Sequence, residues 1–433
     1  MAEPFATRHF WRVIAGSVVV GLISAVCCLV FLALEHAVTG RLWGEGETPM
    51  GYFSGSWSAV AIVLAAAVAV GLLRRWMTID GADPNFIAEM VEGRVPWQRG
   101  FQFGALGLVS LVGGASVGPE APLGTVGGAI GTAVGDRIEP GRPETTEDLT
   151  YAGISGVFGG LGVFPFAGPI MASEVNNTRW QAAPHRLLPG IVSATAAVAV
   201  LYPTVGTPFL DLYDLGTTDL EVRWILLAVA FGVAGAVLGT LTLLVMGVSA
   251  RLANRVTDPL LRATVSGVVI AAIGYALPLT LFSGRDQLTG ILAGGAGVSV
   301  SLLAAVIVGK IVTFTLSMRW GFFGGPIFPL IFMGAVCGTL VHVAIPSVPL
   351  HVAAPAMAAA VAVAVVPLPL MVMVFTTMMF GLQLELGVIP AVAVVTSFVL
   401  VQGTGVVTRL QSALMSRSSG PPPPGLEGGA SRT

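Results

Sequence analysis

Ten apolar runs recur along the 433 residues, each ended by glycine, proline or a charged residue. A helix needs about 20 residues to cross the hydrocarbon core of a bilayer, and several runs approach or exceed that length. Hydrophobic residues make up 55% of the chain and charged residues only 10%, which is not the balance of a water-exposed domain. The pattern therefore predicts an all-α polytopic membrane protein. The runs cover residues 11–34, 57–73, 100–117, 187–201, 223–250, 263–281, 298–317, 327–344, 352–375 and 387–401.

Basic residues indicate how the chain is oriented in the membrane. Arg8 and Arg12 precede the first run, Arg74 and Arg75 follow the second, and Arg417 follows the last. Because cytoplasmic loops carry an excess of Lys and Arg, we expect both termini to face the cytoplasm. The first run lacks a following cleavage site of small residues, so we expect a retained helix and not a removed signal.

The domain organisation is expected to be simple. One membrane domain is predicted over residues 8–417, in two halves of about 8–202 and 223–417 that a polar linker joins. The tail from 418 to 433 is rich in proline, glycine and serine and is expected to be disordered.

Several apolar segments are shorter than a full span and begin at Gly-Pro clusters, at residues 121–134, 168–176 and 326–343. Helix ends at membrane depth must line a cavity or be buried in protein. Their free N–H groups and positive dipole end attract anions. Because such an entrance occurs in each half, "GGASVGPEAPLGTVGGAIG" and "GFFGGPIFPLIFMGAVCG", the sequence indicates an inverted repeat with an anion site between the halves. The simpler alternative is that these glycines only allow close helix packing.

Glu120 is the one carboxylate in the first of these entrances. An ionisable side chain at membrane depth is energetically costly and is a functional candidate by default. The alternative is a first-turn acid that local amides satisfy.

Other chemistries are weakly indicated. "GASVG" at 114–118 matches a nucleophile elbow and would make Ser116 the nucleophile of a membrane hydrolase, but that elbow requires a strand before it and a histidine partner. The three cysteines have no metal-ligand spacing, and no cofactor fingerprint or basic tract for nucleic acid is present. We therefore expect a transporter that is not an enzyme and that needs no cofactor or metal.

The entrances resemble motifs of the CLC family of chloride channels and chloride/proton antiporters. "VGPEAPLGTVGGAIG" is similar to the G-[RK]-E-G-P motif of that family, with Gly118, Glu120 and Pro122 in register. "GKIVTFTLSMRWGFFGGPIFP" resembles the later G-K-x-x-T and G-x-F-x-P region, "DGADPNFIAEMVEG" the G-S-G-I-P region, and "TGVVTRLQSAL" the last helix. The four motifs follow in the family's order over roughly residues 10 to 415.

The resemblance implies a homodimer whose subunits each carry an anion pore, built of about 18 tilted and broken helices. It implies that Glu120 is the gate, which competes with the anion when ionised and swings aside when protonated. The positions that it assigns to anion binding are Gly81, Gly118, Ala121, Gly325, Ile327, Phe328 and Gln411.

Several positions depart from the family pattern. Pro119 and Ala121 replace a basic residue and a glycine, Gly81 replaces the pore serine, and Gln411 stands where a tyrosine is frequent. At the second entrance "GGPIFP" lacks one residue between Phe328 and the following proline. Either Pro326 then takes the place of an amide donor, or Ile327 and Phe328 keep their places.

The largest departure from the family pattern concerns the residues expected to carry protons. The matching helix of the antiporters ends in two acids, whereas this chain has Glu174 followed by Val175. We therefore expect an anion transporter, with chloride as the first candidate, that is channel-like or weakly coupled to protons. A chloride/proton or fluoride/proton antiporter is the alternative, in which a one-residue slip makes Glu174 the relay. The only lysine, Lys310, is expected to have a structural or electrostatic role. A prokaryotic plasma membrane is the expected location.

Overall fold

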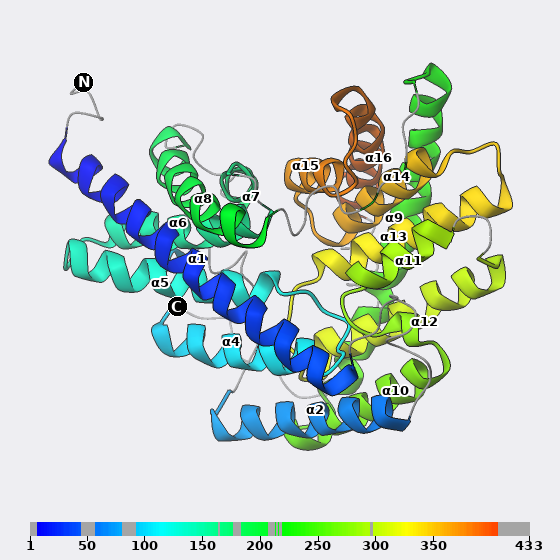
Figure 1. Ribbon diagram of the computed structural model, residues 1–433, viewed down its shortest axis with the longest axis horizontal. Helices are drawn as coiled ribbons and strands as arrows, with labels where there is room; N and C mark the ends of the chain where they lie inside the picture. Colours follow the sequence, from blue (N-terminus) through cyan, green and yellow to red (C-terminus); the bar gives the residue numbers. More distant parts are fainter. Residues whose placement is uncertain are drawn as a thin grey trace, which may run out of the picture.

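The computed structural model describes residues 7–44, 57–79, 92–162, 165–175, 183–206, 213, 215, 219–294 and 298–405. Over these residues the chain forms fifteen α-helices and one isolated backbone bridge, with no strand (Figure 1). The all-α expectation is confirmed. Gly81, Gln411 and the tail from 418 to 433 lie outside the described residues, as do parts of the sequence over which about 18 helices were expected.

Seven described helices belong to the first half of the chain. They are α1 Arg8–Trp43, α2 Trp57–Trp76, α4 Trp97–Val112, α5 Glu120–Ile138, α6 Pro143–Gly162, α7 Ala167–Val175 and α8 Ala183–Val205. The second half contains α9 Val222–Ala253, α10 Pro259–Ala276, α11 Arg285–Gly294, α12 Val300–Arg319, α13 Ile327–Ala344, α14 Leu350–Val365, α15 Pro369–Met379 and α16 Val388–Phe398. Two short 3₁₀ helices, η4 Pro278–Thr280 and η6 Leu384–Gly387, and the π-helix η7 Val399–Gly403 complete it.

The two halves pack in the same way. α1 lies against α6 and α8, just as α9 lies against α14 and α16. α5 packs between α4 and α6, and α13 packs between α12 and α14. In Figure 1 the two groups stand side by side, while α2 and α10 pack together at one end. This correspondence is the inverted repeat that the two Gly-Pro entrances predict.

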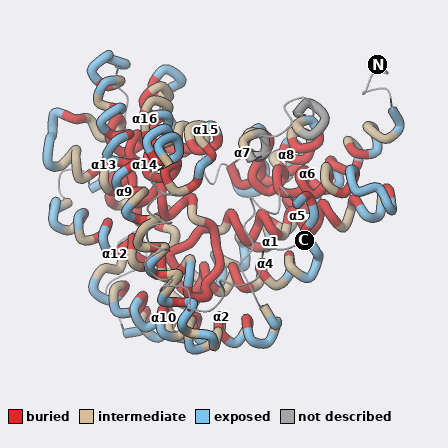
Figure 2. Tube along the Cα trace, turned by 180° about the vertical axis from the view of Figure 1, so that it is seen from behind, coloured by how far each residue is buried: buried red, intermediate tan, exposed pale blue. Residues whose placement is uncertain are grey.

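Small residues let the central helices approach closely. A Cβ added at Gly153 would lie 2.0 Å from the carbonyl oxygen of Gly127, where α6 meets α5. A Cβ at Gly338 would lie 2.4 Å from the carbonyl oxygen of Ala353, where α13 meets α14. Backbone contacts of this kind drive helix association in membranes, where lipid is as apolar as the helix interface. The buried residues accordingly concentrate along these helices in the middle of the molecule (Figure 2).

The outer helices expose apolar side chains. Val26 on α1 is 53% exposed and Val237 on α9 is 66% exposed, which is costly in water and favourable against hydrocarbon. Within the described part of the chain, eight helices are long and apolar enough to cross a membrane: α1, α2, residues 187–205 of α8, α9, α10, α12, α13 and the segment 384–403. The chain is therefore a multi-pass membrane protein.

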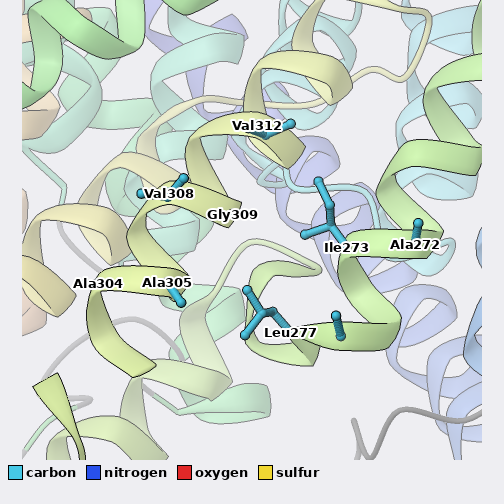
Figure 3. Close-up of a pocket in the computed structure, with 9 residues that line it drawn as sticks. Ala272, Ile273, Leu277, Ala304, Ala305, Val308, Gly309 and Val312 are labelled. Atoms are coloured by element: carbon cyan, nitrogen blue, oxygen red, sulfur yellow. The ribbon is translucent and has the colours of Figure 1, made fainter. Parts of the chain in front are cut away.

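A wide apolar groove of about 700 Å³ runs between α10 and α12. Figure 3 shows Ile273 and Leu277 on one side and Val308 and Val312 on the other, with Gly309 on the α12 wall. All nine residues that line the groove are Ala, Gly, Val, Leu or Ile, so it offers no polar group to a substrate and suits contact with acyl chains.

Candidate functional site

The two half-helix entrances meet at one point in the structure. Gly118, just before α5, and Gly325, just before α13, exchange both backbone hydrogen bonds as an antiparallel pair, at 2.8 and 2.7 Å. Pro119 and Pro326 then cap the two helices with nearly the same backbone angles, φ −77° and ψ −10° for Pro119 and φ −88° and ψ −16° for Pro326. Proline has no N–H, but an N–H at the start of a helix would have no partner within the helix. Proline at these positions therefore costs no intrahelical hydrogen bond. The N-termini of α5 and α13 are thus held next to each other.

The carboxylate of Glu120 lies across this junction. Glu120 is the first residue of α5, yet its Oε1 accepts a hydrogen bond from the backbone N–H of Ile327, the first residue of α13, at 2.6 Å. The side chain is only 2% exposed. The carboxylate accepts from the first backbone amide of α13, at the positive end of the helix dipole, and so takes the position that a bound anion would take.

Two glycines make room for this carboxylate. A Cβ at Gly118 would lie 2.0 Å from Glu120 Oε2, and a Cβ at Gly325 would lie 2.1 Å from Glu120 Cδ. Both separations are far inside van der Waals contact, so any other residue at either position would have to displace the carboxyl group. Oε2 is buried without a hydrogen-bond partner among the described residues.

The second entrance has a definite register. Because Gly325 pairs with Gly118, Pro326 corresponds to Pro119 and Ile327 to Glu120. Ile327 therefore keeps its place as an amide donor, and Pro326 lies outside the helix. Phe328 and Ala121, the second residues of α13 and α5, are buried beside the junction, at 4% and 5% exposure. The structure thus brings together five of the expected anion-site positions with Glu120; Gly81 and Gln411 lie outside the described residues.

Glu174 lies near the end of α7 and binds a different helix. Its carboxylate accepts hydrogen bonds from the backbone N–H groups of Leu370 and Met371, the latter at 2.9 Å. These amides belong to the first turn of α15, so Glu174 caps that helix. Val175 is the last residue of α7. A role in proton transfer for either residue remains a prediction.

Lys310 is completely buried on α12. Its Nζ donates to the backbone carbonyls of Thr280, Leu281 and Phe282 at 3.3, 3.1 and 2.6 Å, and it lies 4.8 Å from the centre of the Phe332 ring. Three acceptors match the three donors of an ammonium group. Thr313, the other polar residue of the G-K-x-x-T pattern, also donates to Thr280 O, at 3.0 Å. Lys310 thus holds the end of η4 and the loop before α11 against α12.

Ser116 lies between two helices, α4 and α5, where the nucleophile elbow would need a strand before the turn. It is fully buried, and its backbone N–H donates to the hydroxyl of Ser317 at 3.0 Å. Ser116 therefore does not have the surroundings that a hydrolase nucleophile needs.

A small cavity of about 80 Å³ lies next to the junction. Pro119 and Phe328 form part of its wall, together with Glu35, Arg285 and Asp286. The cavity lies near the end of α1 opposite to Arg8 and Arg12. It combines polar and apolar lining residues.

Sequence reasoning missed several polar contacts, one just before the second helix entrance and one at the far end of α5. Arg74, whose side chain is 1% exposed, donates from Nε to Gly321 O at 2.5 Å. Glu139, which follows α5, binds His9, Arg12, Arg142 and Thr145. Each contact joins residues that lie far apart in the sequence or are separated by a turn, so no local pattern reveals it.

Comparison with known proteins identifies the family. The model of a family described as voltage gated chloride channel matches residues 65–402. Putative ion-transport protein YfeO of Escherichia coli (strain SMS-3-5 / SECEC) is 26% identical over 342 residues, which cover 77% of this chain and 79% of that protein. YfeO of Shigella flexneri is 25% identical over 342 residues, which cover 77% of this chain and 79% of that protein.

Solved structures agree in fold. A slow cyanobacterial Cl⁻/H⁺ antiporter matches with a TM-score of 0.73 at 20% identity, over 94% of this chain and 98% of that one. A CLC-type fluoride/proton antiporter matches with a TM-score of 0.73 at 16% identity, over 90% of this chain and 95% of that one. The fold and the paired helix entrances define an anion-transport protein of the membrane. The chain belongs to the CLC family of voltage gated chloride channels, as a divergent member.

Proposed function

We propose that this protein carries a small anion, with chloride as the first candidate, through a pore in each subunit, and that Glu120 is the gate. The observation that carries the proposal is the 2.6 Å hydrogen bond from Ile327 N to Glu120 Oε1. When ionised, the carboxylate occupies the amide that a bound anion would use. When protonated, it loses its charge, and the helix dipole no longer favours it over a free anion.

The cavity beside Pro119 and Phe328 is the proposed outer approach. With Arg8 and Arg12 on the cytoplasmic side, the Glu35 end of α1 faces outward. Arg285 lines the cavity with a positive charge that is paired with Asp286 at 3.6 Å, and the carboxylates of Glu35 and Asp286 are the proposed stations for protons on their way to Glu120.

Coupling to protons is proposed to be weak. The carboxylate of Glu174 is engaged by two amides at the start of α15, and the residue that follows it is a valine. These bonds give Glu174 a structural role as a cap of α15, and no second carboxylate follows it on α7. The alternative is a coupled chloride/proton or fluoride/proton antiporter, which is the activity of the two structures with the same fold, with Glu174 as the relay.

Flux through liposomes tests the gate. The purified protein is reconstituted, and chloride efflux is measured at several pH values for the natural chain and for Glu120→Gln, which resembles the protonated gate. We expect faster efflux with little pH dependence. Glu144→Gln, an exposed carboxylate on α6, is the matched control and should behave like the natural chain. Efflux of Glu120→Gln that keeps its rate and its pH dependence would contradict the proposal.

The same liposomes test coupling and ion choice. A chloride gradient is imposed, and the internal pH is followed with a dye. Little or no uphill proton movement is expected, whereas proton pumping in fixed ratio to chloride would establish the antiporter. Replacing chloride by fluoride or nitrate orders the anions by rate.

The assembly and the location follow from the family resemblance. We propose a homodimer in a prokaryotic plasma membrane with both termini in the cytoplasm, a transporter with no catalytic activity. The mass of the protein in detergent and the labelling of a cysteine introduced near Arg8 from each side of the membrane test these points. A monomeric mass, or labelling from outside, would contradict them.

A further inference from the structure

The helices that precede the two entrances, α4 and α12, carry the same polar residue at the same distance from the junction. Ser110 stands eight residues before Gly118, and Ser317 stands eight residues before Gly325. Both serines lie near the ends of the preceding helices, α4 and α12, and both are completely buried. The proposed function gives neither residue a role.

Each serine hydroxyl binds the loop of the opposite half. Ser110 Oγ accepts a hydrogen bond from the backbone N–H of Phe323, at 3.0 Å. Ser317 Oγ accepts one from the backbone N–H of Ser116, also at 3.0 Å. Phe323 and Ser116 stand two residues before Gly325 and Gly118, so the two bonds correspond to each other across the repeat.

The hydroxyl protons are committed as well. Ser110 donates to Leu106 O and Ser317 donates to Thr313 O, each at 2.8 Å and each four residues back on its own helix. Because the proton is fixed on the helix side, a lone pair of each oxygen is directed to the loop amide. Each serine therefore links the end of its helix to the entrance of the other half.

Both bonds lie close to the gate along the chain. Ser116 and Phe323 are followed two residues later by the paired Gly118 and Gly325, and two residues after that by Glu120 and Ile327, which share a hydrogen bond. A loop amide that loses its acceptor in this buried place has no water to replace it, so the loop must move to find a partner. Such a movement is transmitted over four residues, from Phe323 to Ile327 or from Ser116 to Glu120.

We propose that Ser110 and Ser317 are positioning residues that hold the two helix entrances in register and thereby set how firmly the Glu120 carboxylate is bound to the Ile327 amide. This inference rests on the proposed gating role of Glu120. It assigns the two serines equivalent roles, one for each partner of the gate: Ser317 orients the loop that bears Glu120, and Ser110 orients the loop that bears Ile327.

The test compares Ser110→Ala and Ser317→Ala in the liposome flux assay as a function of pH. Loss of one buried hydrogen bond, at about 0.5–1.5 kcal/mol, predicts a flux about two- to tenfold higher at pH values where the gate is closed. The pH of half-maximal flux should shift in the same direction for both variants. The charged groups around the gate stay unchanged: Glu35, Arg285 and Asp286 line the cavity, Arg74 binds Gly321, and Lys310 binds Phe282.

Ser17→Ala is the matched control. Ser17 on α1 is also completely buried and also donates to the carbonyl four residues back, Val13 O at 2.8 Å, but it lies away from the entrances. Its substitution removes the same bond within a helix but no loop contact, so the pH profile should stay unchanged. Serine variants that match Ser17→Ala in flux and pH profile would overturn the proposal.

A second background separates gating from general damage. In Glu120→Gln the serine substitutions should no longer alter the flux, because the charged gate that they position is gone. Effects that persist unchanged in this background would overturn the proposal. Should the alanine variants not fold, Ser110→Thr and Ser317→Thr, which keep the hydroxyl, are compared with Ser110→Cys and Ser317→Cys, which keep the size but accept weakly. The threonine forms should keep the natural pH profile and the cysteine forms should shift it; equal profiles would count against the proposal.

The two ideas can fail separately. If Glu120→Gln leaves flux and pH dependence unchanged, the gate itself is disproved. If Glu120→Gln frees the flux and the serine variants do not shift it, only the positioning role fails.

Discussion

Gly325 has no side chain, and the carboxyl group of Glu120 occupies the space that a side chain at this position would fill. A Cβ on Gly325 would be 2.1 Å from Glu120 Cδ, so the two groups cannot occupy that space together. The presence of glycine in one half is thus a condition for the position of the acid in the other half.

Gly325→Ala should displace the carboxylate and open the gate. Losing a hydrogen bond to a charged group costs about 1.5–3 kcal/mol, which corresponds to roughly ten- to hundredfold in the occupancy of the closed position. We expect chloride flux that is raised and less dependent on pH, with no further increase when Glu120→Gln is added. Gly247→Ala on α9, where an added Cβ meets nothing within 4 Å, is the control and should leave the flux unchanged. A Gly325→Ala protein with the natural pH profile would contradict this prediction.

Lys310→Met should destabilise the protein. The substitution keeps the length of the side chain but removes its hydrogen bond to Phe282 O, at about 1–3 kcal/mol, whereas Leu281 O keeps a bond from Gln287 and Thr280 O keeps one from Thr313. A lower midpoint of thermal unfolding in detergent is expected. Val308→Met, on the exposed side of the same helix, should keep the natural midpoint. An unchanged midpoint for Lys310→Met would show that these contacts do not stabilise the fold.

Glu139 should make the stability of the protein depend on pH in the acid range. Hydrogen bonds from Thr145, and then from Arg12, His9 and Arg142, lower its pKa to about 2 from the ordinary 4.5. Because the folded state holds the ionised form more strongly than the unfolded state, this contribution is complete above pH 4.5 and is lost as the pH falls toward 2. The melting temperature of Glu139→Gln should therefore lie below that of the natural chain at pH 7, and the difference should shrink at lower pH.

Glu144→Gln is the control for this pH series, because Glu144 is an exposed acid in the first turn of the next helix. Its melting temperature should follow that of the natural chain throughout. A deficit of Glu139→Gln that is as large in acid as at pH 7 would count against the ion cluster as its cause.

Glu174 should act mainly as a helix cap. Glu174→Ala removes the acceptor of the Leu370 and Met371 amides and should cost about 0.5–2 kcal/mol of stability. Glu174→Gln keeps an acceptor oxygen and should lose less, with chloride flux unchanged. Thermal unfolding and flux are measured on both. If Glu174→Gln instead abolishes proton movement driven by chloride, the residue is a relay and the antiporter alternative is correct.

The sequence was sufficient for the architecture because its signals are local. Apolar runs predicted the membrane helices, and the Gly-Pro clusters marked the starts of α5 and α13, at Glu120 and Ile327. The pairing of the two entrances followed from their similarity. The family, the all-α repeat and the multi-pass class are confirmed, whereas the domain bounds and the roles of the site residues remain predictions.

The side-chain contacts of the site were less predictable because their partners lie far apart in the sequence. Ser110 and Phe323 are 213 residues apart, and Glu174 and Met371 are 197 apart. No periodic pattern connects such positions. One signal was available for the serines, since the repeated interval from Ser110 to Gly118 and from Ser317 to Gly325 can be read without a structure. For Glu174, reading the helix end as a proton site gave no indication of the α15 amides.

The space that Gly118 and Gly325 leave for the carboxylate serves only one of the two helix entrances. The repeat provides two equivalent half-helix entrances, but Glu120 occupies the first position of one and Ile327 that of the other. The carboxylate is therefore an intramolecular ligand whose effective concentration is fixed by a short tether, of the order of millimolar or more, whatever the medium contains. A free anion must outcompete this tethered carboxylate before it gains the Ile327 amide, so the concentration of that anion outside the membrane and the length of one side chain together set the range in which the site responds.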